Sequence, residues 1–192
     1  MRFLETIRAE GGTALHLEYH RLRMARTLEA FGIAAEYDLE SLIRPPSGEL
    51  TRCRLLYGSG GVQITYHPYT PRTFRALQAV VCDHLAYEFK YADRSALDAA
   101  FEGRGTADDV VIVQNGLLTD TTIANIALFD GDRWITPRSP LLRGTTRDRL
   151  LESGFLSEGD IPLETLERYE RCALMNAMVG FVEVENGIIS PR

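Results

Sequence analysis

Lysine is almost absent from this sequence. The 192 residues include 21 lysines and arginines, and Lys90, in the stretch YEFKYADRS, is the single lysine among them. Arginine can replace lysine as a surface charge, but a guanidinium cannot lose its proton and attack a carbonyl carbon as an amine can. A general bias of the chain toward arginine is one explanation for the solitary lysine. The other is an amine that forms a Schiff base with a carbonyl compound.

Other features are missing as well. The chain has no apolar run of membrane-spanning length, and its first residues lack the apolar stretch of a signal peptide. No basic cluster accompanies the net charge of −6, which argues against a nucleic-acid partner. These absences predict a cytoplasmic protein. Cysteines are few: Cys53, Cys82 and Cys172 are odd in number and widely spaced, which predicts buried free thiols and neither disulfides nor a metal site.

What is present is typical of a globular protein. Hydrophobic residues make up 45% of the chain and charged residues 25%, so one large domain or two small ones can form a core. The stretch from Pro68 to Thr73, PYTPRT, interrupts the periodic pattern and is the best candidate for a linker. We therefore predict an α+β protein with a smaller lobe over residues 1–75 and a larger lobe over residues 76–192.

In the first lobe, residues 3–17 predict a hairpin around a turn at Glu10 to Gly12. Apolar residues at helical spacing predict a helix over residues 18–31, ended by Gly32. Asp38 is placed to cap a short second helix that ends before Pro45. Residues 51–69 predict two strands on either side of a glycine-rich turn.

In the second lobe, the pattern predicts a strand within residues 74–84 and a helix over residues 94–101. Residues 108–137 predict a meander of strands with Asn-Gly and Asp-Gly turns at 115–116 and 130–131. Two further helices are predicted over residues 145–154 and 161–169. Residues 172–189 predict two strands, with a third Asn-Gly turn at 186–187.

Three sites beyond Lys90 carry groups that a bound ligand could use. Gly144, Thr145 and Thr146 stand directly before a predicted helix, where free N–H groups bind an anion or are simply capped. Arg23, on the first helix, is either a phosphate-binding charge or a solvated side chain. Asp120 lies in an otherwise apolar, threonine-rich run and is either a turn residue or the partner of a buried cation.

Each of these features is weak alone, but together they specify a cofactor. An amine, an anion site and a carboxylate for a ring nitrogen are the three anchors that pyridoxal phosphate requires. His16 and His20 have no third ligand at a suitable spacing, so we interpret both as structural and predict no metal.

The order of these motifs resembles the class-IV aminotransferase family. This family of fold-type-IV pyridoxal-phosphate enzymes includes branched-chain and D-amino-acid aminotransferases and 4-amino-4-deoxychorismate lyase. The resemblance covers almost the whole chain. It rests on FLETIRAEGGTALHLEYHRLRMARTLEAFG, on FKYADR, and most specifically on NGLLTDTTIANIALFDGDRWITPRSPLLRGTTR.

The resemblance implies a two-lobed fold like that of D-amino-acid aminotransferase, with pyridoxal 5′-phosphate between the lobes. It also implies a homodimer and a small-molecule amino substrate, while the composition alone predicts neither a membrane nor a nucleic-acid partner. By position in the motifs, it assigns Lys90 as the catalytic, cofactor-binding amine and Asp120 as the partner of the ring nitrogen. The remaining cofactor-binding residues that it implies are Arg23 and the backbone of Thr145 and Thr146 at the phosphate, Leu142 on the ring, and Asn176 with Ala177.

Several features bear on the branch of the family. Asn176 and Ala177 stand in LMNAMVGFVEV, where the aminotransferases have a Gly-Thr pair, so this ending is similar to the lyase. Arg94, four residues after Lys90, is also as in the lyase branch, and so is a start close to the ETIR strand. The family usually has glutamate where this chain has Asp120. We predict a 4-amino-4-deoxychorismate lyase of the folate route. The alternatives are an aminotransferase for branched-chain or D-amino acids, or a weakly active or inactive member that serves as a binding module.

Overall fold

The computed structural model describes residues 1–190, which form two compact units. The first unit comprises Met1–Pro71 and Phe89–Asp93, and the second comprises Arg72–Glu88 and the chain from Arg94 onward. The predicted boundary between residues 75 and 76 therefore differs from the structural one by four residues. The prediction also placed Phe89–Asp93 in the second lobe, whereas the structure returns this segment to the first unit. There it pairs by backbone hydrogen bonds with a strand more than 80 residues earlier in the chain.

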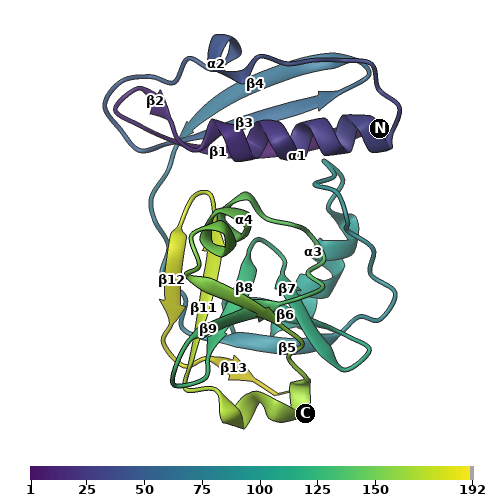
Figure 1. The fold of residues 1–192 in the computed structure, drawn as a ribbon, viewed down its shortest axis with the longest axis vertical. Coiled ribbons are helices and arrows are strands. Elements are labelled where there is room, and N and C mark those ends of the chain that lie inside the picture. Colours follow the sequence, from purple (N-terminus) through teal and green to yellow (C-terminus); the bar gives the residue numbers. More distant parts are fainter. Residues whose placement is uncertain (191–192) are drawn as a thin grey trace. The chain divides into compact units, whose positions relative to one another are not determined.

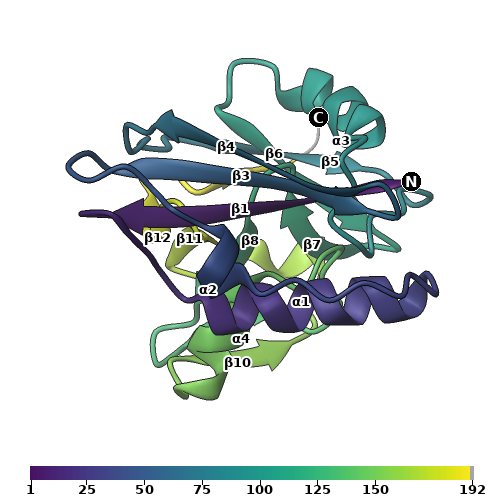
Figure 2. The same cartoon turned by 90° about the horizontal axis from the view of Figure 1, so that it is seen from above.

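The first unit is built on a four-stranded antiparallel sheet in the order β2-β1-β3-β4. Its strands are β1 (Arg2–Glu10), β2 (Thr13–Ala14), β3 (Thr51–Gly58) and β4 (Gly61–Pro68). Helix α1 (Leu17–Ala30) runs alongside β1, and the short helix α2 (Leu39–Leu42) follows it (Figure 2). The predicted elements of residues 1–69 are therefore all present in this unit.

The local signals of the first unit act as predicted. Gly32, just after α1, has a φ of 60°, a conformation that glycine adopts without steric cost. The side chain of Asp38 accepts a hydrogen bond of 3.2 Å from Ser41 N and caps α2. The apolar core of this unit is formed by residues of β1, β3 and both helices, with Ile43 just after α2: Phe3, Ile7, Met24, Leu28, Leu39, Ile43, Cys53, Leu55 and Tyr57.

The second unit is built on a nine-stranded sheet that contains parallel and antiparallel pairs. Its main order is β10-β9-β8-β7-β6-β5-β13, and β11 pairs with both β8 and β12. The strands are β5 (Leu77–Val81), β6 (Asp109–Gln114), β7 (Leu117–Thr121), β8 (Asn125–Phe129), β9 (Trp134–Pro137), β10 (Leu156–Gly159), β11 (Arg171–Asn176), β12 (Gly180–Val184) and β13 (Ile188–Ile189). The α+β prediction is confirmed.

Helices flank this sheet. Helix α3 (Ser95–Phe101), continued by the 3₁₀ turn η1 (Glu102–Arg104), lies beside β6, and α4 (Thr145–Glu152) lies beside β11 (Figure 1). The Asn-Gly turn between β6 and β7 forms as predicted, with positive φ at both Asn115 and Gly116.

Three predictions for the second unit need correction. Residues 161–169 form the 3₁₀ helix η2 (Leu163–Arg168) and not an α-helix. Its first residue, Leu163, donates its N–H to the Gly116 carbonyl, which lies outside the helix, and short connecting helices of this kind are commonly 3₁₀. Residues 172–189 form three strands and not two, because β13 pairs in parallel with β5. Cys82 is half-buried, whereas Cys53 and Cys172 are buried as predicted.

Two kinds of feature are absent from residues 1–190. Within residues 1–190, no helix combines the length and the apolar character that crossing a membrane requires. The same residues include no group of three or more histidine, cysteine, aspartate or glutamate side chains that could hold a metal ion.

Candidate functional site

Lys90 is held in the first unit by strand-like pairing. Leu4 N donates a hydrogen bond of 2.8 Å to the Lys90 carbonyl, and Ala92 N donates one of 2.9 Å to the Arg2 carbonyl. Aromatic rings pack on either side of the lysine in the chain: Tyr91 against Phe3, and Phe89 against Phe31. The backbone of Lys90 therefore has a defined position beside β1.

Arg23 is also in the first unit, and it is paired with a carboxylate that the sequence analysis did not single out. Its Nε and Nη2 donate to the two carboxylate oxygens of Glu5, at 2.9 and 2.5 Å. His20 Nδ1 lies 2.6 Å from Glu5 Oε2. One sequence signal could have found Glu5. It stands midway between Phe3 and Ile7, two residues from each, so the three side chains lie on the same, buried face of β1.

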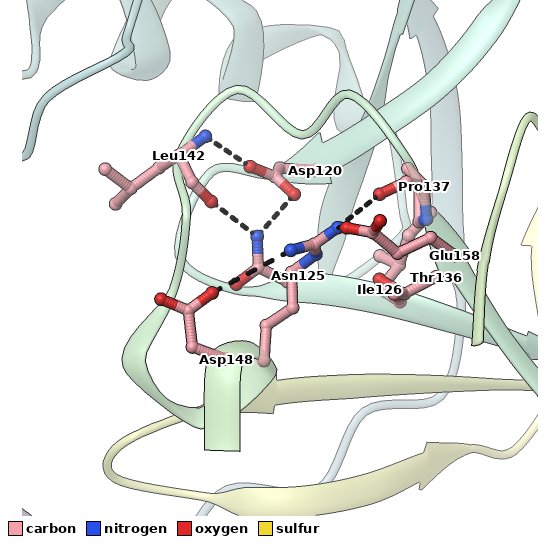
Figure 3. A network of polar contacts seen from close by, with 9 residues as sticks. Asp120, Asn125, Ile126, Thr136, Pro137, Leu142, Asp148 and Glu158 are labelled. Atoms are coloured by element: carbon pink, nitrogen blue, oxygen red, sulfur yellow. Dashed lines mark hydrogen bonds and ion pairs between the residues drawn. The ribbon is translucent and has the colours of Figure 1, made fainter. Parts of the chain in front are cut away.

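Asp120, at the end of β7 in the second unit, is buried and doubly hydrogen-bonded (Figure 3). Asn125 Nδ2 donates to Asp120 Oδ1 at 2.7 Å, and Leu142 N donates to Asp120 Oδ2 at 2.8 Å. The same amide of Asn125 also donates to the Leu142 carbonyl at 2.8 Å. The three residues thus form a closed set of contacts that fixes the plane of the carboxylate.

The environment of Asp120 holds its pKa far from the ordinary value. Burial raises the pKa of Asp120 from 3.8 to about 7, against the opposing effect of the hydrogen bonds from Leu142 and Asn125 and of the positive charge of Arg147. Arg147 is itself buried, and its Nη2 donates to the Pro137 carbonyl and to Glu158 Oε1, at 2.9 and 2.6 Å. Burial disfavours the ionised form of this carboxyl group, and a bound group that carries a proton and a positive charge would stabilise that form.

Gly144, Thr145 and Thr146 lie at the start of α4, as predicted. Gly144 is the N-cap residue, and the two threonines are buried in the first turn of the helix. A Cβ atom on Gly144 would stand 1.9 Å from Asn125 Oδ1, so only glycine fits at this position. The N–H groups of a first helical turn have no acceptor within the helix and point along its positive end, which favours a phosphate.

Asn176 and Ala177 lie at the same end of the strands as Asp120. Asp120 pairs with Asn125 across β7 and β8, and Asn125 pairs with Met175 across β8 and β11. Asn176 follows Met175, and its Nδ2 lies 3.2 Å from the Ile123 carbonyl. The register of three strands therefore brings Asp120 and the turn at 176–177 to one region of the second unit.

The predicted site residues thus fall into two groups. Lys90 and Arg23 belong to the first unit. The second unit carries the others: Asp120, Leu142, Thr145, Thr146, Asn176 and Ala177. Sequence reasoning missed Asn125 and Arg147, which surround Asp120. The polar Asn125 at the start of the apolar stretch NIALF is a signal that could have found it, whereas the burial of Arg147 within TTRDRL is known from the structure alone.

Comparison with known proteins identifies the family. The model of the family Amino-transferase class IV matches residues 2–186, and the chain belongs to this family. An uncharacterized protein from Haemophilus influenzae is 37% identical over 182 residues, which cover 92% of this chain and 97% of that protein. A crystal structure of a candidate 4-amino-4-deoxychorismate lyase from Haemophilus somnus is 32% identical, with a TM-score of 0.88 over 93% of this chain and 97% of that one.

The family uses pyridoxal phosphate as its cofactor. A hypothetical aminotransferase from Mycobacterium tuberculosis, solved in its PLP-bound form, shares the fold with a TM-score of 0.81 at 19% identity, over 97% of this chain and 81% of that one. The residues of this chain fit the cofactor's chemistry. Asp120 offers a buried carboxylate to a ring nitrogen, and the Gly144 turn leaves no room for a Cβ beside the start of α4.

Proposed function

We propose that this protein is a pyridoxal-phosphate-dependent lyase that converts 4-amino-4-deoxychorismate into 4-aminobenzoate and pyruvate. The buried Asp120, held by Asn125 and Leu142 in a setting that favours a protonated partner, is the observation that supports cofactor chemistry. The name given to the Haemophilus somnus protein, 32% identical over most of both chains, supports the lyase reaction. A homodimer remains a prediction.

Lys90 and Asp120 have distinct chemical tasks in this proposal. Bound pyridoxal phosphate supplies an electron sink for the charge left when the substrate loses its α-proton. Lys90 Nζ would hold the cofactor through its aldehyde, and the same amine would serve as the general base that takes the α-proton of the substrate. Asp120 keeps a proton on the ring nitrogen, because an ionised carboxylate stabilises the adjacent positive charge.

The phosphate group is assigned to Arg23 and to the first turn of α4. The guanidinium of Arg23 contributes a permanent charge. Thr145 and Thr146 contribute backbone N–H groups at the positive end of the helix. Each charge-assisted contact of this kind contributes about 1.5–3 kcal/mol, or roughly ten- to a hundred-fold in affinity.

The first test concerns Lys90. Borohydride reduction of the protein with bound cofactor, followed by peptide mass spectrometry, should place the modification on Lys90. Lys90→Ala and Lys90→Arg should both abolish this labelling and all turnover, although arginine keeps the charge. Because the chain holds no other lysine, labelling at any other residue would overturn the assignment.

The second test separates the lyase from an aminotransferase. A lyase regenerates the aldehyde form of its cofactor at each turnover and needs no 2-oxo acid, whereas an aminotransferase stops until such an acceptor arrives. The protein should therefore release 4-aminobenzoate and pyruvate repeatedly from 4-amino-4-deoxychorismate alone. Absence of these products, together with amino-group exchange between branched-chain or D-amino acids and 2-oxoglutarate, would establish the aminotransferase instead. Neither activity, with cofactor bound, would indicate a binding module.

A further inference from the structure

Three polar side chains form a buried cluster in the first unit. Glu5 on β1 is fully buried, His20 on α1 is 1% exposed, and the side chain of Arg23, one turn further along α1, is 12% exposed. Arg23 contacts both oxygens of the Glu5 carboxylate, and His20 Nδ1 contacts Oε2. A fully buried carboxylate is costly unless it is paired and hydrogen-bonded, and this one is both.

The charge states of the cluster follow from its contacts. Burial would raise the pKa of Glu5, but the charge of Arg23 and the hydrogen bonds from His20 and Arg23 lower it to about 2. Burial lowers the pKa of His20, opposed by Glu5 and reinforced by the charges of Arg23 and Lys90. Glu5 is therefore ionised and His20 neutral at pH 7. Since a carboxylate only accepts hydrogen bonds, His20 carries its proton on Nδ1 and donates it to Glu5.

The geometry of the cluster restrains Arg23 strongly. A guanidinium that binds a carboxylate through two parallel N–H groups is fixed in its plane as well as in its position. The strand that carries Glu5 also holds the lysine segment, because Leu4 N donates to the Lys90 carbonyl. Adjacent residues of β1 thus set the location of the Arg23 guanidinium and of the Lys90 backbone.

We infer that Glu5 and His20 are positioning residues that hold the Arg23 guanidinium in place for the phosphate of the cofactor. The inference rests on the proposed function, which assigns Arg23 to that phosphate. Charge alone predicts the opposite for Glu5: a carboxylate beside a phosphate-binding arginine repels the phosphate, so its removal would tighten binding. Fixing the orientation of Arg23 predicts that removal weakens binding. The sign of the effect therefore separates the two explanations.

The experiment compares the affinity of each protein for pyridoxal 5′-phosphate with its affinity for pyridoxal, which lacks the phosphate. The affinity for pyridoxal 5′-phosphate divided by that for pyridoxal is here called the phosphate preference. In this ratio, any effect of a substitution on binding of the aldehyde or the ring cancels. Arg23→Ala should lower the preference roughly ten- to a hundred-fold, as expected for a lost charge-assisted contact. Glu5→Gln keeps the shape of the side chain but loses the charge, and it should lower the preference about ten-fold.

His20 provides a matched pair of variants. His20→Leu removes the donor to Glu5 and should lower the phosphate preference roughly two- to ten-fold, the range for a neutral hydrogen bond. His20→Asn retains an N–H donor near the position of Nδ1 and should stay within about two-fold of the wild type. Restoration by asparagine distinguishes positioning from a general packing defect, since asparagine fills the pocket less well than leucine. Thermal unfolding of the cofactor-free proteins shows whether each variant is folded.

Each result has a defined meaning. An unchanged or increased preference in Glu5→Gln, with a lowered preference in Arg23→Ala, would overturn the inference and leave the proposed function intact. An unchanged preference in Arg23→Ala would remove Arg23 from the phosphate site and the inference with it. If Glu5→Gln does not fold, the histidine pair decides: equal preferences for His20→Leu, His20→Asn and the wild type would overturn the inference.

Discussion

Replacing Asp120 with asparagine should change how the stability of the cofactor-free protein depends on pH. The folded protein holds the pKa of Asp120 at about 7, chiefly through burial, whereas the ordinary value is 3.8. Between these values the folded state keeps a proton that the unfolded chain has released, so stability falls as pH rises. The whole gap corresponds to about 4 kcal/mol, of which about 3 kcal/mol falls between pH 5 and pH 8.

The asparagine variant lacks this titration and carries a constant penalty instead. Asparagine replaces one of the two carboxylate oxygens with an amide nitrogen. This nitrogen must face either Asn125 Nδ2 or Leu142 N, both of which are hydrogen-bond donors. A mismatch of this kind costs about 1–3 kcal/mol at every pH. The variant should therefore be less stable than the wild type at pH 5 and as stable or more stable at pH 8.

The assay is denaturant unfolding at several pH values, followed by tryptophan fluorescence. Trp134 is the single tryptophan of the chain and is buried in the same unit as Asp120. Other titrating groups, His20 among them, contribute equally to both proteins and cancel in the difference. If that difference stays constant from pH 5 to pH 8, Asp120 titrates alike in the folded and unfolded states, and the reasoning fails.

Three further substitutions test the local geometry. Thr145→Pro should lower cofactor affinity roughly ten- to a hundred-fold with little change in melting temperature. Proline is accepted at the first helical position, and Gly144 has the extended ψ of 142° that must precede a proline. Unaltered affinity would exclude the Thr145 amide from the phosphate site. Gly144→Ala should lower the free energy of unfolding by about 3 kcal/mol, since its Cβ would overlap Asn125 Oδ1, and a neutral result in denaturant unfolding would contradict the close contact. Gly116→Ala, at a φ of 78°, should cost about 1–2 kcal/mol in the same assay without affecting cofactor binding.

Much of the fold could be read from neighbouring residues alone. The glycine after α1, the Asp38 cap and the Asn-Gly turn at 115–116 act within a few residues of the chain, so their sequence patterns predicted the structure correctly. The exceptions include η2, β13 and the return of Phe89–Asp93 to the first unit. Leu163 bonds to Gly116, and β13 pairs with β5 more than 100 residues away, and no local pattern encodes such partners.

The candidate site shows the same division. The solitary Lys90, the carboxylate at 120 and the GTT stretch at the start of α4 were recognisable by residue type, because each is a chemical group that the cofactor needs. Their surroundings were decided by tertiary structure. Glu5 meets Arg23 across 18 positions and Asp120 meets Leu142 across 22, through strand register and burial. Burial in turn raises the pKa of Asp120 and lowers that of His20. Burial would also raise the pKa of Glu5, but the charge of Arg23 and the hydrogen bonds from His20 and Arg23 lower it, because the net shift depends on which partners the fold places beside a desolvated charge.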